Sequence, residues 1–246
     1  MDLGLNGRTA IVCGASQGMG LAVAEALAAE GANVAMFARR RDELESAASR
    51  FGALAVPGDL TVPADLASLV ERTLEAFGGI DILVLNGGGP PSGTAMAMTA
   101  EQVGAGVELL LTSHVRLVGL CLPHLRASGH GRIVAIESTS VKEPLPNLAL
   151  SNAIRPGVSG WLRTLAREIG PDGVTVNTIA PGRIDTERLR SIYPDGLTEH
   201  DLESIPLRRP GTPAEIADVA CFLASDRAAY VTGTVLAVDG GFLRGA

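Results

Sequence analysis

Short apolar runs and longer segments with apolar residues at helical spacing alternate along the whole chain. The apolar runs, which predict buried strands, lie at residues 9–13, 33–38, 54–56, 80–85, 132–137, 174–179 and 235–238. The segments with helical spacing predict helices near residues 18–30, 42–51, 63–77, 100–126, 152–170 and 213–224. Continuously apolar strands that alternate with helices are typical of a parallel sheet covered on both faces. We therefore predict an α/β fold with a doubly wound parallel sheet of about seven strands.

One segment, residues 185–206, departs from this alternation. It is polar and is interrupted by Pro194, Gly196 and Pro206. Ligands bind at the carboxyl ends of parallel strands, so a polar segment over that edge is typical of a mobile substrate lid; an ordinary surface excursion is the alternative. No linker, repeat or low-complexity block divides the chain, so we expect residues 1–246 to form a single domain that includes this segment.

The composition narrows the function classes and the location. The formal net charge of −7 disfavours nucleic-acid binding, which needs a basic surface. No window holds the roughly 18 uninterrupted apolar residues of a membrane span, and no basic segment precedes an apolar run at the N-terminus, so we expect neither a membrane anchor nor a signal peptide. The cysteines Cys13, Cys121 and Cys221 lie far apart, in apolar surroundings and without metal-ligand spacing. They fit the reduced thiols of a cytoplasmic protein that has no metal site.

A glycine-rich turn separates the first predicted strand from the first predicted helix. The turn reads Gly14-Ala15-Ser16-Gln17-Gly18-Met19-Gly20, with the spacing G-x-x-x-G-x-G. Gly14 permits a tight turn, and Gly18 and Gly20 let a pyrophosphate approach backbone N–H groups. These groups lie at a helix N-terminus, where unsatisfied donors and a partial positive charge favour an anion. The order of strand, glycine turn and helix therefore predicts a phosphate-binding site.

Further motifs along the chain carry a more specific resemblance. They are Asp59-Leu60, Leu85-Asn86-Gly87-Gly88, Pro181-Gly182-x-Ile184-x-Thr186, and the segments 209–217 and 232–241. Together with the glycine turn they resemble the short-chain dehydrogenase/reductase family over residues 5–243, and within it the acyl-carrier-protein reductase-like members most. The resemblance implies a single-domain, Rossmann-like fold and a nicotinamide dinucleotide cofactor.

The resemblance also assigns cofactor contacts, with adenine near Asp59 and nicotinamide near Thr186. The residues expected at the cofactor are Gly14, Ser16, Gln17, Gly18, Met19, Gly20, Arg39, Arg40, Asp59, Leu60, Asn86, Gly87, Gly88, Arg155, Pro181, Gly182, Ile184 and Thr186. The second predicted strand ends at Arg39-Arg40, where NAD-preferring relatives carry a carboxylate. An arginine fork suits a 2′-phosphate, which a carboxylate would repel. NADP(H) is therefore favoured over NAD(H); a solvated basic helix start is the alternative interpretation of these arginines.

The catalytic residues of the family, Asn, Ser, Tyr and Lys, are only partly present. Ser138 matches the family's Ser, whereas Ser151 stands at the Tyr position, Arg155 at the Lys position and Leu110 at the Asn position. A Tyr hydroxyl can be tuned toward the working pH, which a Ser hydroxyl cannot, and a guanidinium keeps its proton. The catalytic residues expected are Ser138, Ser151 and Arg155, with a non-standard proton donor. Pro156 further predicts that the helix either starts late or kinks there.

Several side chains are candidates for the missing proton donor. Tyr193 lies in the predicted lid, and Lys142 and Glu143 lie in the loop after Ser138. His114 lies one helical turn after the Asn position. Glu137 should point to the opposite face of the sheet by strand alternation, unless the loop has already begun there.

Three functions agree with these residues. The first is an NADP(H)-dependent oxidoreductase that acts on a small carbonyl/alcohol pair. The second is a cofactor-binding protein without redox turnover, such as a sensor or an assembly partner. The third, ranked last, is non-redox chemistry like that of the halohydrin dehalogenases, which resemble this family and use Ser, Tyr and Arg. Those enzymes keep the Tyr and give up the cofactor role of the glycine turn, whereas this sequence does the reverse. The apolar helical segments 107–125 and 158–169 match those that form homotetramer interfaces in the family, so a homotetramer is expected.

Overall fold

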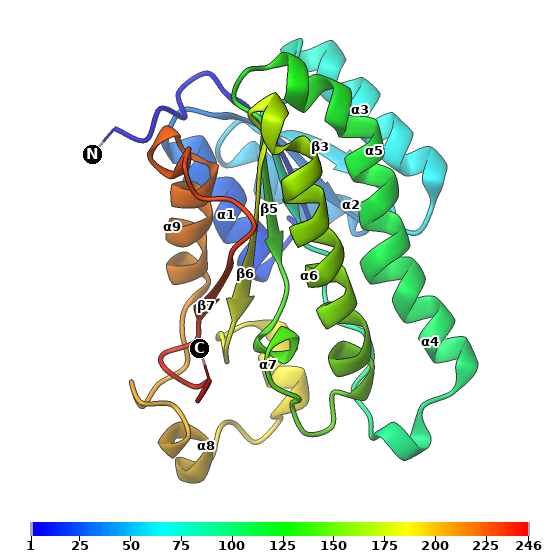
Figure 1. The fold of residues 1–246 in the computed structure, drawn as a ribbon, viewed down its shortest axis with the longest axis vertical. Coiled ribbons are helices and arrows are strands. Elements are labelled where there is room, and N and C mark those ends of the chain that lie inside the picture. Colours follow the sequence, from blue (N-terminus) through cyan, green and yellow to red (C-terminus); the bar gives the residue numbers. More distant parts are fainter. Residues whose placement is uncertain (1, 246) are drawn as a thin grey trace.

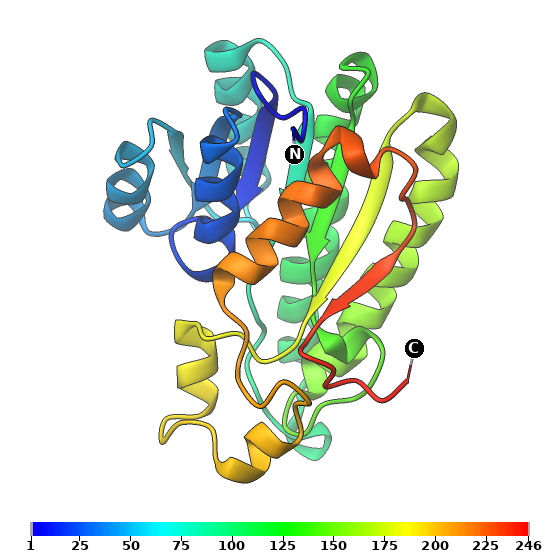
Figure 2. The same cartoon turned by 90° about the vertical axis from the view of Figure 1, so that its left-hand side faces the viewer.

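The computed structural model describes residues 2–245 and contains one parallel sheet with the strand order β3-β2-β1-β4-β5-β6-β7 (Figure 1). The strands are β1 (Thr9–Cys13), β2 (Asn33–Ala38), β3 (Leu54–Pro57), β4 (Ile82–Leu85), β5 (Arg132–Ile136), β6 (Thr175–Pro181) and β7 (Val235–Val238). Helices cover both faces of the sheet (Figure 2). The predicted doubly wound α/β fold with a seven-stranded parallel sheet is therefore confirmed.

The helices form two layers. One face is covered by α1 (Gly18–Ala29), α2 (Arg41–Ser49) and α9 (Pro213–Ala224). The other is covered by α3 (Pro63–Phe77), α4 (Ala100–Val107), α5 (Ser113–Ala127) and α6 (Ala149–Ile169). Because successive strand residues point to opposite faces, Ile11 packs with the second layer and Val12 with the first, and both are fully buried. Burial on both faces explains why the strands are continuously apolar in the sequence.

The structure differs from the sequence prediction at a few element boundaries. Strand β5 ends at Ile136, one residue earlier than expected, so Glu137 already belongs to the following loop. The helix expected at residues 100–126 is interrupted by a π-helical turn, η2 (Glu108–Thr112). Pro156 lies inside α6, which begins at Ala149; a late helix start at the proline is therefore wrong. The segment 185–206 contains two short helices, α7 (Glu187–Ile192) and α8 (Glu199–Glu203).

The strand order reverses between β1 and β4, which are neighbours in the sheet although β2 and β3 intervene in the sequence. The glycine turn leaves the end of β1 and the Asn86 turn leaves the end of β4, and the Asn86 side chain donates a hydrogen bond to the Gly14 carbonyl at 3.5 Å. Such a switch point opens a crevice at the carboxyl ends of the strands. This crevice is where the predicted motifs meet.

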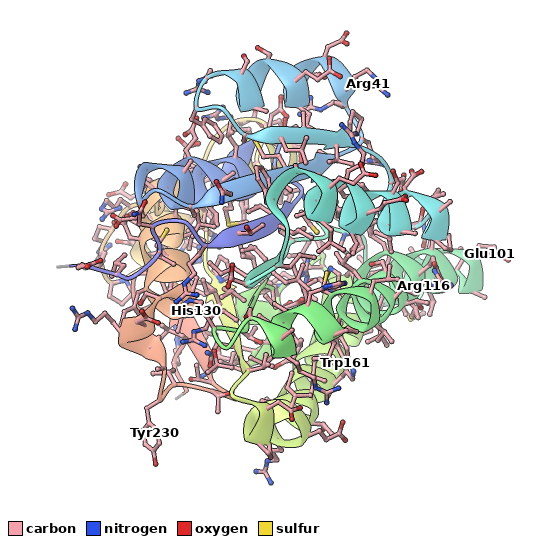
Figure 3. The ribbon with its side chains drawn as sticks, turned by 90° about the horizontal axis from the view of Figure 1, so that it is seen from above. Arg41, Glu101, Arg116, His130, Trp161 and Tyr230 are labelled. Carbon is pink, nitrogen blue, oxygen red and sulfur yellow. The ribbon has the colours of Figure 1, made fainter. Side chains whose placement is uncertain are left out.

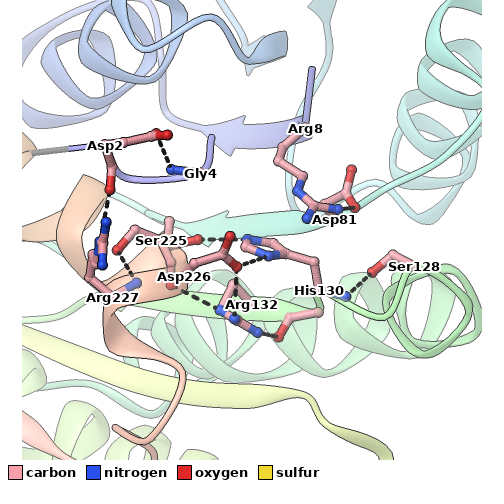
Figure 4. A network of polar contacts seen from close by, with 12 residues as sticks. Asp2, Gly4, Arg8, Asp81, Ser128, His130, Arg132, Ser225, Asp226 and Arg227 are labelled. Carbon is pink, nitrogen blue, oxygen red and sulfur yellow. Dashed lines mark hydrogen bonds and ion pairs between the residues drawn. The ribbon is translucent and has the colours of Figure 1, made fainter. Parts of the chain in front are cut away.

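A polar network occupies the opposite edge of the sheet, at the start of β5 (Figure 4). The His130 ring contacts the Asp226 carboxylate at 2.8 Å through Nδ1 and the Ala224 carbonyl at 3.0 Å through Nε2. Arg132 hydrogen-bonds the carbonyls of Gly131 and Ser225. These contacts tie the end of α9 to β5, and His130 therefore has a structural role far from the crevice.

The continuous helical stretch Ala100–Ala127 is long and apolar enough to cross a membrane by length and composition. In this fold Leu117 and Cys121 of that stretch are fully buried in the core beneath the sheet. Its apolar character therefore has a packing explanation. Viewed from above, helices flank the sheet on both sides, and Tyr230 projects away from the body of the molecule (Figure 3).

Candidate active site

One cleft of about 1280 Å³ follows the carboxyl edge of the sheet. It brings together every predicted site residue except Gly20. Those that line it are Gly14, Ser16, Gln17, Gly18, Met19, Arg39, Arg40, Asp59, Leu60, Asn86, Gly87, Gly88, Ser138, Ser151, Arg155, Pro181, Gly182, Ile184 and Thr186. Residues up to about 170 positions apart in the sequence thus face one cavity, because each motif follows a strand end.

The glycine turn is shaped for close backbone approach. Gly14 and Gly18 have φ of 60° and 58°, in the left-handed region that favours glycine. A Cβ on Gly20 would lie 2.2 Å from the Gly14 carbonyl oxygen, so Gly20 is needed for α1 to pack on the turn and not as a lining residue. The N-cap, Gln17, makes no side-chain capping bond, and the first turn holds no acidic residue. The N–H groups at the start of α1 are therefore available to an anion such as a pyrophosphate.

The end of the cleft beyond β2 is basic. Arg39 and Arg40 line it, and Arg40 hydrogen-bonds Gln17 and pairs with Glu43 at 3.4 Å. Asp59, across from them, accepts hydrogen bonds from the Thr61 N–H and hydroxyl at 2.9 and 2.8 Å. Burial alone would raise the pKa of Asp59, but these hydrogen bonds and the charge of Arg39 lower it below its usual value. The residues at this end fit a phosphorylated adenosine ribose.

The other end of the cleft is formed by the β4, β5 and β6 loops. Thr186 accepts a hydrogen bond from the Leu189 N–H at 3.3 Å and so caps α7. Its methyl group faces the glycine turn, since a Cβ on Gly18 would lie 3.5 Å from Thr186 Cγ2. The motif after β6 therefore lies close to the glycine turn, and both line the cleft, so that one dinucleotide could contact both.

The residues at the family's catalytic positions surround this end of the cleft. The Ser151 hydroxyl, in the first turn of α6, lies 2.9 Å from the Ser140 hydroxyl, and the Ser138 hydroxyl accepts a hydrogen bond from the Ser140 N–H at 3.1 Å. Leu110 is fully buried in the π-helical turn. Ser151 and Ser140 thus pair through their hydroxyls, and Ser140 contacts Ser138 through its backbone N–H, while the residue expected at the Asn position offers only an apolar side chain.

Arg155 makes a buried ion pair that the sequence prediction missed. Its Nη1 donates to Glu137 Oε2 at 2.9 Å, and its Nη2 donates to the Gly88 carbonyl. The Glu137 side chain is completely buried, and its Oε1 has no partner among the described residues. Burial raises the pKa of Glu137 above its usual value, against the opposing charge of Arg155. Two features of the sequence could have indicated this ion pair. They are the carboxylate directly before Ser138 and the arginine at the position expected for the family's Lys.

His114 is buried beside this pair but does not line the cleft. A Cβ on Gly87 would lie 3.2 Å from His114 Nε2, and neither ring nitrogen has a partner among residues 2–245. Burial, with the nearby charge of Arg155, lowers the pKa of His114 to about 3. The ring is therefore neutral and separated from the cleft by the Gly87 turn.

Of the remaining candidate proton donors, Tyr193 lines the cleft, whereas Lys142 and Glu143 do not. The Tyr193 hydroxyl accepts a hydrogen bond from Arg183 at 3.3 Å, so it is held within the segment 185–206. Glu143 instead accepts hydrogen bonds from the Arg244 and Gly245 N–H groups, and Lys142 is not among the lining residues.

The segment 185–206 forms one wall of the cleft. Arg183 donates to the Ser204 hydroxyl at 2.6 Å and the Asp201 carboxylate at 3.2 Å, and packs over the rings of Tyr193 and Phe242. Arg188, on α7, donates to the Pro90 carbonyl at 2.6 Å. Sequence reasoning missed both arginines, because Arg183 stands at an unspecified position of the motif after β6 and Arg188 lies beyond that motif.

Comparisons with known proteins agree with this geometry. Residues 14–243 match the family model described as enoyl-(acyl carrier protein) reductase. The chain is 37% identical to the 3-oxoacyl-[acyl-carrier-protein] reductase of Escherichia coli, with 97% of this chain and 98% of that protein covered. It is 36% identical to an uncharacterized oxidoreductase of Mycobacterium bovis, covering 96% and 97%.

Two solved structures are also similar. L-Sorbose reductase from Gluconobacter frateurii, complexed with NADPH and L-sorbose, superposes with a TM-score of 0.93 at 33% identity and covers 100% of both chains. An NADPH-bound short-chain oxidoreductase of Pseudomonas aeruginosa, described as containing an atypical catalytic center, gives a TM-score of 0.91 at 32% identity and covers 97% of this chain and 98% of that one.

Removing one member of the buried ion pair should be more damaging than removing both. Arg155→Met leaves the Glu137 carboxylate buried without a counter-charge and should lower the free energy of unfolding by about 3–5 kcal/mol. The double variant Glu137→Met/Arg155→Met should lose less. Urea denaturation at neutral pH measures both; a double variant as unstable as the sum of the single variants would contradict the pairing.

His114 should make the stability of the protein depend on pH. Its pKa is 6.5 when unperturbed and about 3 in the fold, so below pH 6.5 the unfolded chain binds a proton that the folded chain excludes. Stability should therefore be complete above this pH and fall toward pH 3, by up to about 1.4 kcal/mol per pH unit relative to His114→Leu. Denaturation of both proteins between pH 7.5 and 5 tests this; equal pH slopes would rule it out.

Proposed function

This chain belongs to the short-chain dehydrogenase/reductase family of oxidoreductases; on that premise we propose that it is an NADP(H)-dependent enzyme that interconverts a small carbonyl compound and its alcohol. The observation that carries the proposal is the single cleft, in which a glycine turn, two basic residues and Ser138 face one cavity. When bound, the cofactor supplies or accepts the hydride. The protein must then hold the cofactor, orient the substrate and move one proton.

The cofactor proposed is NADP(H), favoured over NAD(H). Its pyrophosphate would lie at the uncapped start of α1. Arg39 and Arg40 would hold the 2′-phosphate, because no carboxylate stands at the end of β2 to repel it. The NADPH bound in the sorbose reductase and Pseudomonas structures supports this choice.

The proposed chemistry uses Ser138, Ser151 and Arg155. Ser138 would donate a hydrogen bond to the substrate oxygen and orient the carbonyl. The Ser140 N–H donates to the Ser138 hydroxyl and so helps to orient it, and the paired Ser140 and Ser151 hydroxyls can each donate and accept a hydrogen bond. Arg155 keeps its own proton, so its role is to stabilise negative charge that develops on the substrate oxygen. The proton donor in this scheme cannot be a tyrosine on α6, because position 151 holds a serine.

The segment 185–206, which forms one wall of the cleft, is proposed to be the substrate lid.

The whole chain is proposed to form a cytoplasmic homotetramer. Support for self-association comes from exposed apolar side chains on α5, α9, β7 and the loop before β7, namely Val115, Leu120, Phe222, Tyr230 and Leu236. A contiguous apolar patch is typical of a surface that a partner covers, so the proposed tetramer requires these side chains to be covered in the assembly. Tyr230 projects furthest from the molecule (Figure 3).

A second function, cofactor binding without redox turnover, has its own support. Ser151 at the Tyr position and the buried Leu110 remove two of the groups that move the proton in the family. A sensor or an assembly partner would keep the cofactor cleft and need no proton donor.

Turnover separates the two functions. The purified protein should oxidise NADPH, followed by its absorbance, with members of a panel of small ketones and aldehydes, and Ser138→Ala should lower kcat by about 10²-fold because a transition-state hydrogen bond is lost. Tight NADPH binding in calorimetry with no turnover on this panel or on the matching alcohols with NADP⁺ would favour the second function.

Cofactor preference should depend on the arginines at the end of β2. Arg39→Met/Arg40→Met should weaken NADPH binding by roughly 10- to 100-fold, since charge-assisted hydrogen bonds of about 1.5–3 kcal/mol are lost, and should leave NADH binding unchanged. Arg41→Met is the matched control, because Arg41 pairs with Glu45 at 3.1 Å and does not line the cleft. Equal losses for NADPH and NADH would refute the assignment.

A further inference from the structure

Two arginines on different helices hold the loop that follows β4. Arg155, on α6, donates to the Gly88 carbonyl, and Arg188, on α7, donates to the Pro90 carbonyl at 2.6 Å. Between them, a Cβ on Gly89 would lie 2.9 Å from Arg188 Nε. Both arginines line the cleft. Two guanidinium groups are thus held two residues apart along one loop, at the end of the cleft that contains Ser138 and Ser151.

Only one of these arginines has a counter-charge. Arg155 pairs with Glu137, and the Arg183 guanidinium in the same wall pairs with Asp201 at 3.2 Å. No carboxylate of residues 2–245 lies within 4.0 Å of Arg188, although Glu187 precedes it and lines the cleft. Its one acceptor is a neutral carbonyl, and its Nε and Nη1 donate no hydrogen bond within the described residues.

The positive charge of Arg155 also acts on Arg188. Partial burial, together with the positive charge of Arg155, lowers the pKa of Arg188 below its usual value. An anion placed between the two groups would relieve this repulsion and satisfy the unused donors of a planar fork, which matches a carboxylate in a bidentate manner. Apolar side chains also line this cleft, among them Leu145, Leu148, Leu189 and Ile192, and suit the carbon skeleton of a small molecule.

We propose that Arg188 is a specificity residue that binds a carboxylate on the substrate, so that the enzyme prefers short oxo acids, or the corresponding hydroxy acids, to neutral carbonyl compounds. The inference rests on the proposed oxidoreductase function and names its substrate class. On binding, the substrate carboxylate replaces the Pro90 carbonyl as the acceptor of Arg188. Because α7 carries Arg188, the same contact draws the segment 185–206 onto the substrate.

Besides a substrate carboxylate, the pyrophosphate of a bound cofactor would place an anion in this cleft. It has its own donors at the start of α1, which face Thr186, whereas Arg188 is anchored on the Gly88–Pro90 loop. The two sources make different predictions: a phosphate contact strengthens cofactor binding without substrate, and a carboxylate contact does not.

The test compares oxo acids with their neutral esters in wild type, Arg188→Met and Arg190→Met. Arg190 is the matched control, because it lies on the same helix and pairs with Asp185 at 3.0 Å outside the cleft. With NADPH, kcat/KM for pyruvate and acetoacetate should exceed that for methyl pyruvate and methyl acetoacetate. Arg188→Met should lower kcat/KM for the acids by roughly 10- to 100-fold, with less than about a threefold change for the esters. Arg190→Met should change neither.

Two further measurements separate the ways in which the inference can fail. NADPH affinity of Arg188→Met, measured by calorimetry without substrate, should equal that of wild type; weaker binding would assign Arg188 to the cofactor and overturn the proposal, as would equal losses on acids and esters. If neither the oxo acids nor their esters turn over, titration of the wild-type NADP⁺ complex with pyruvate tests the carboxylate site without turnover. Binding that Arg188→Met abolishes supports the carboxylate site although the oxidoreductase function fails, and no binding refutes the site.

Discussion

The ion pair between Glu137 and Arg155 joins the three elements on which the Ser138 end of the cleft is built. Glu137 follows β5, Arg155 lies on α6, and the second Arg155 contact reaches the loop after β4. A buried charge is tolerated only with a partner and further hydrogen bonds, so the orientation of α6 and the path of the β4 loop depend on each other. Ser151 lies one turn before Arg155 on α6. The position of its hydroxyl against Ser140 is therefore set by the same pair.

The elements of this fold were predictable because the inner strands of the sheet are buried on both faces and the edge strand β7 is also apolar along its length. The bounds of β1, β2 and β7 agree with the apolar runs at residues 9–13, 33–38 and 235–238. Most of the predicted site residues meet in one cleft for the same reason: each motif follows a strand end, and parallel strands end at one edge. Gly20 is the exception, and its missing Cβ serves packing against Gly14.

What the sequence did not predict depends on contacts that no local pattern encodes. The direction of Glu137 changes with a single residue at the end of β5, because a strand ending at Ile136 releases Glu137 from the alternation. The contact of Arg188 with Pro90 joins residues 98 positions apart. Hydrophobic periodicity reports which face of an element is buried, and it carries no information on which distant carbonyl a long side chain reaches.

Arginine in place of lysine changes what the cleft can do with a proton. A guanidinium remains charged at any working pH, so Arg155 and Arg188 contribute fixed positive charge and no proton. His114 does not fill this role, since burial and Arg155 keep it neutral and behind the Gly87 turn. In the proposed function, proton movement would then fall to hydroxyl groups that line the cleft, namely those of Ser138 and Ser151. Fixed charge favours an anionic oxygen, and it favours an anionic substrate by the same electrostatics, so the proposed roles of Arg155 and Arg188 rest on one arrangement of arginines.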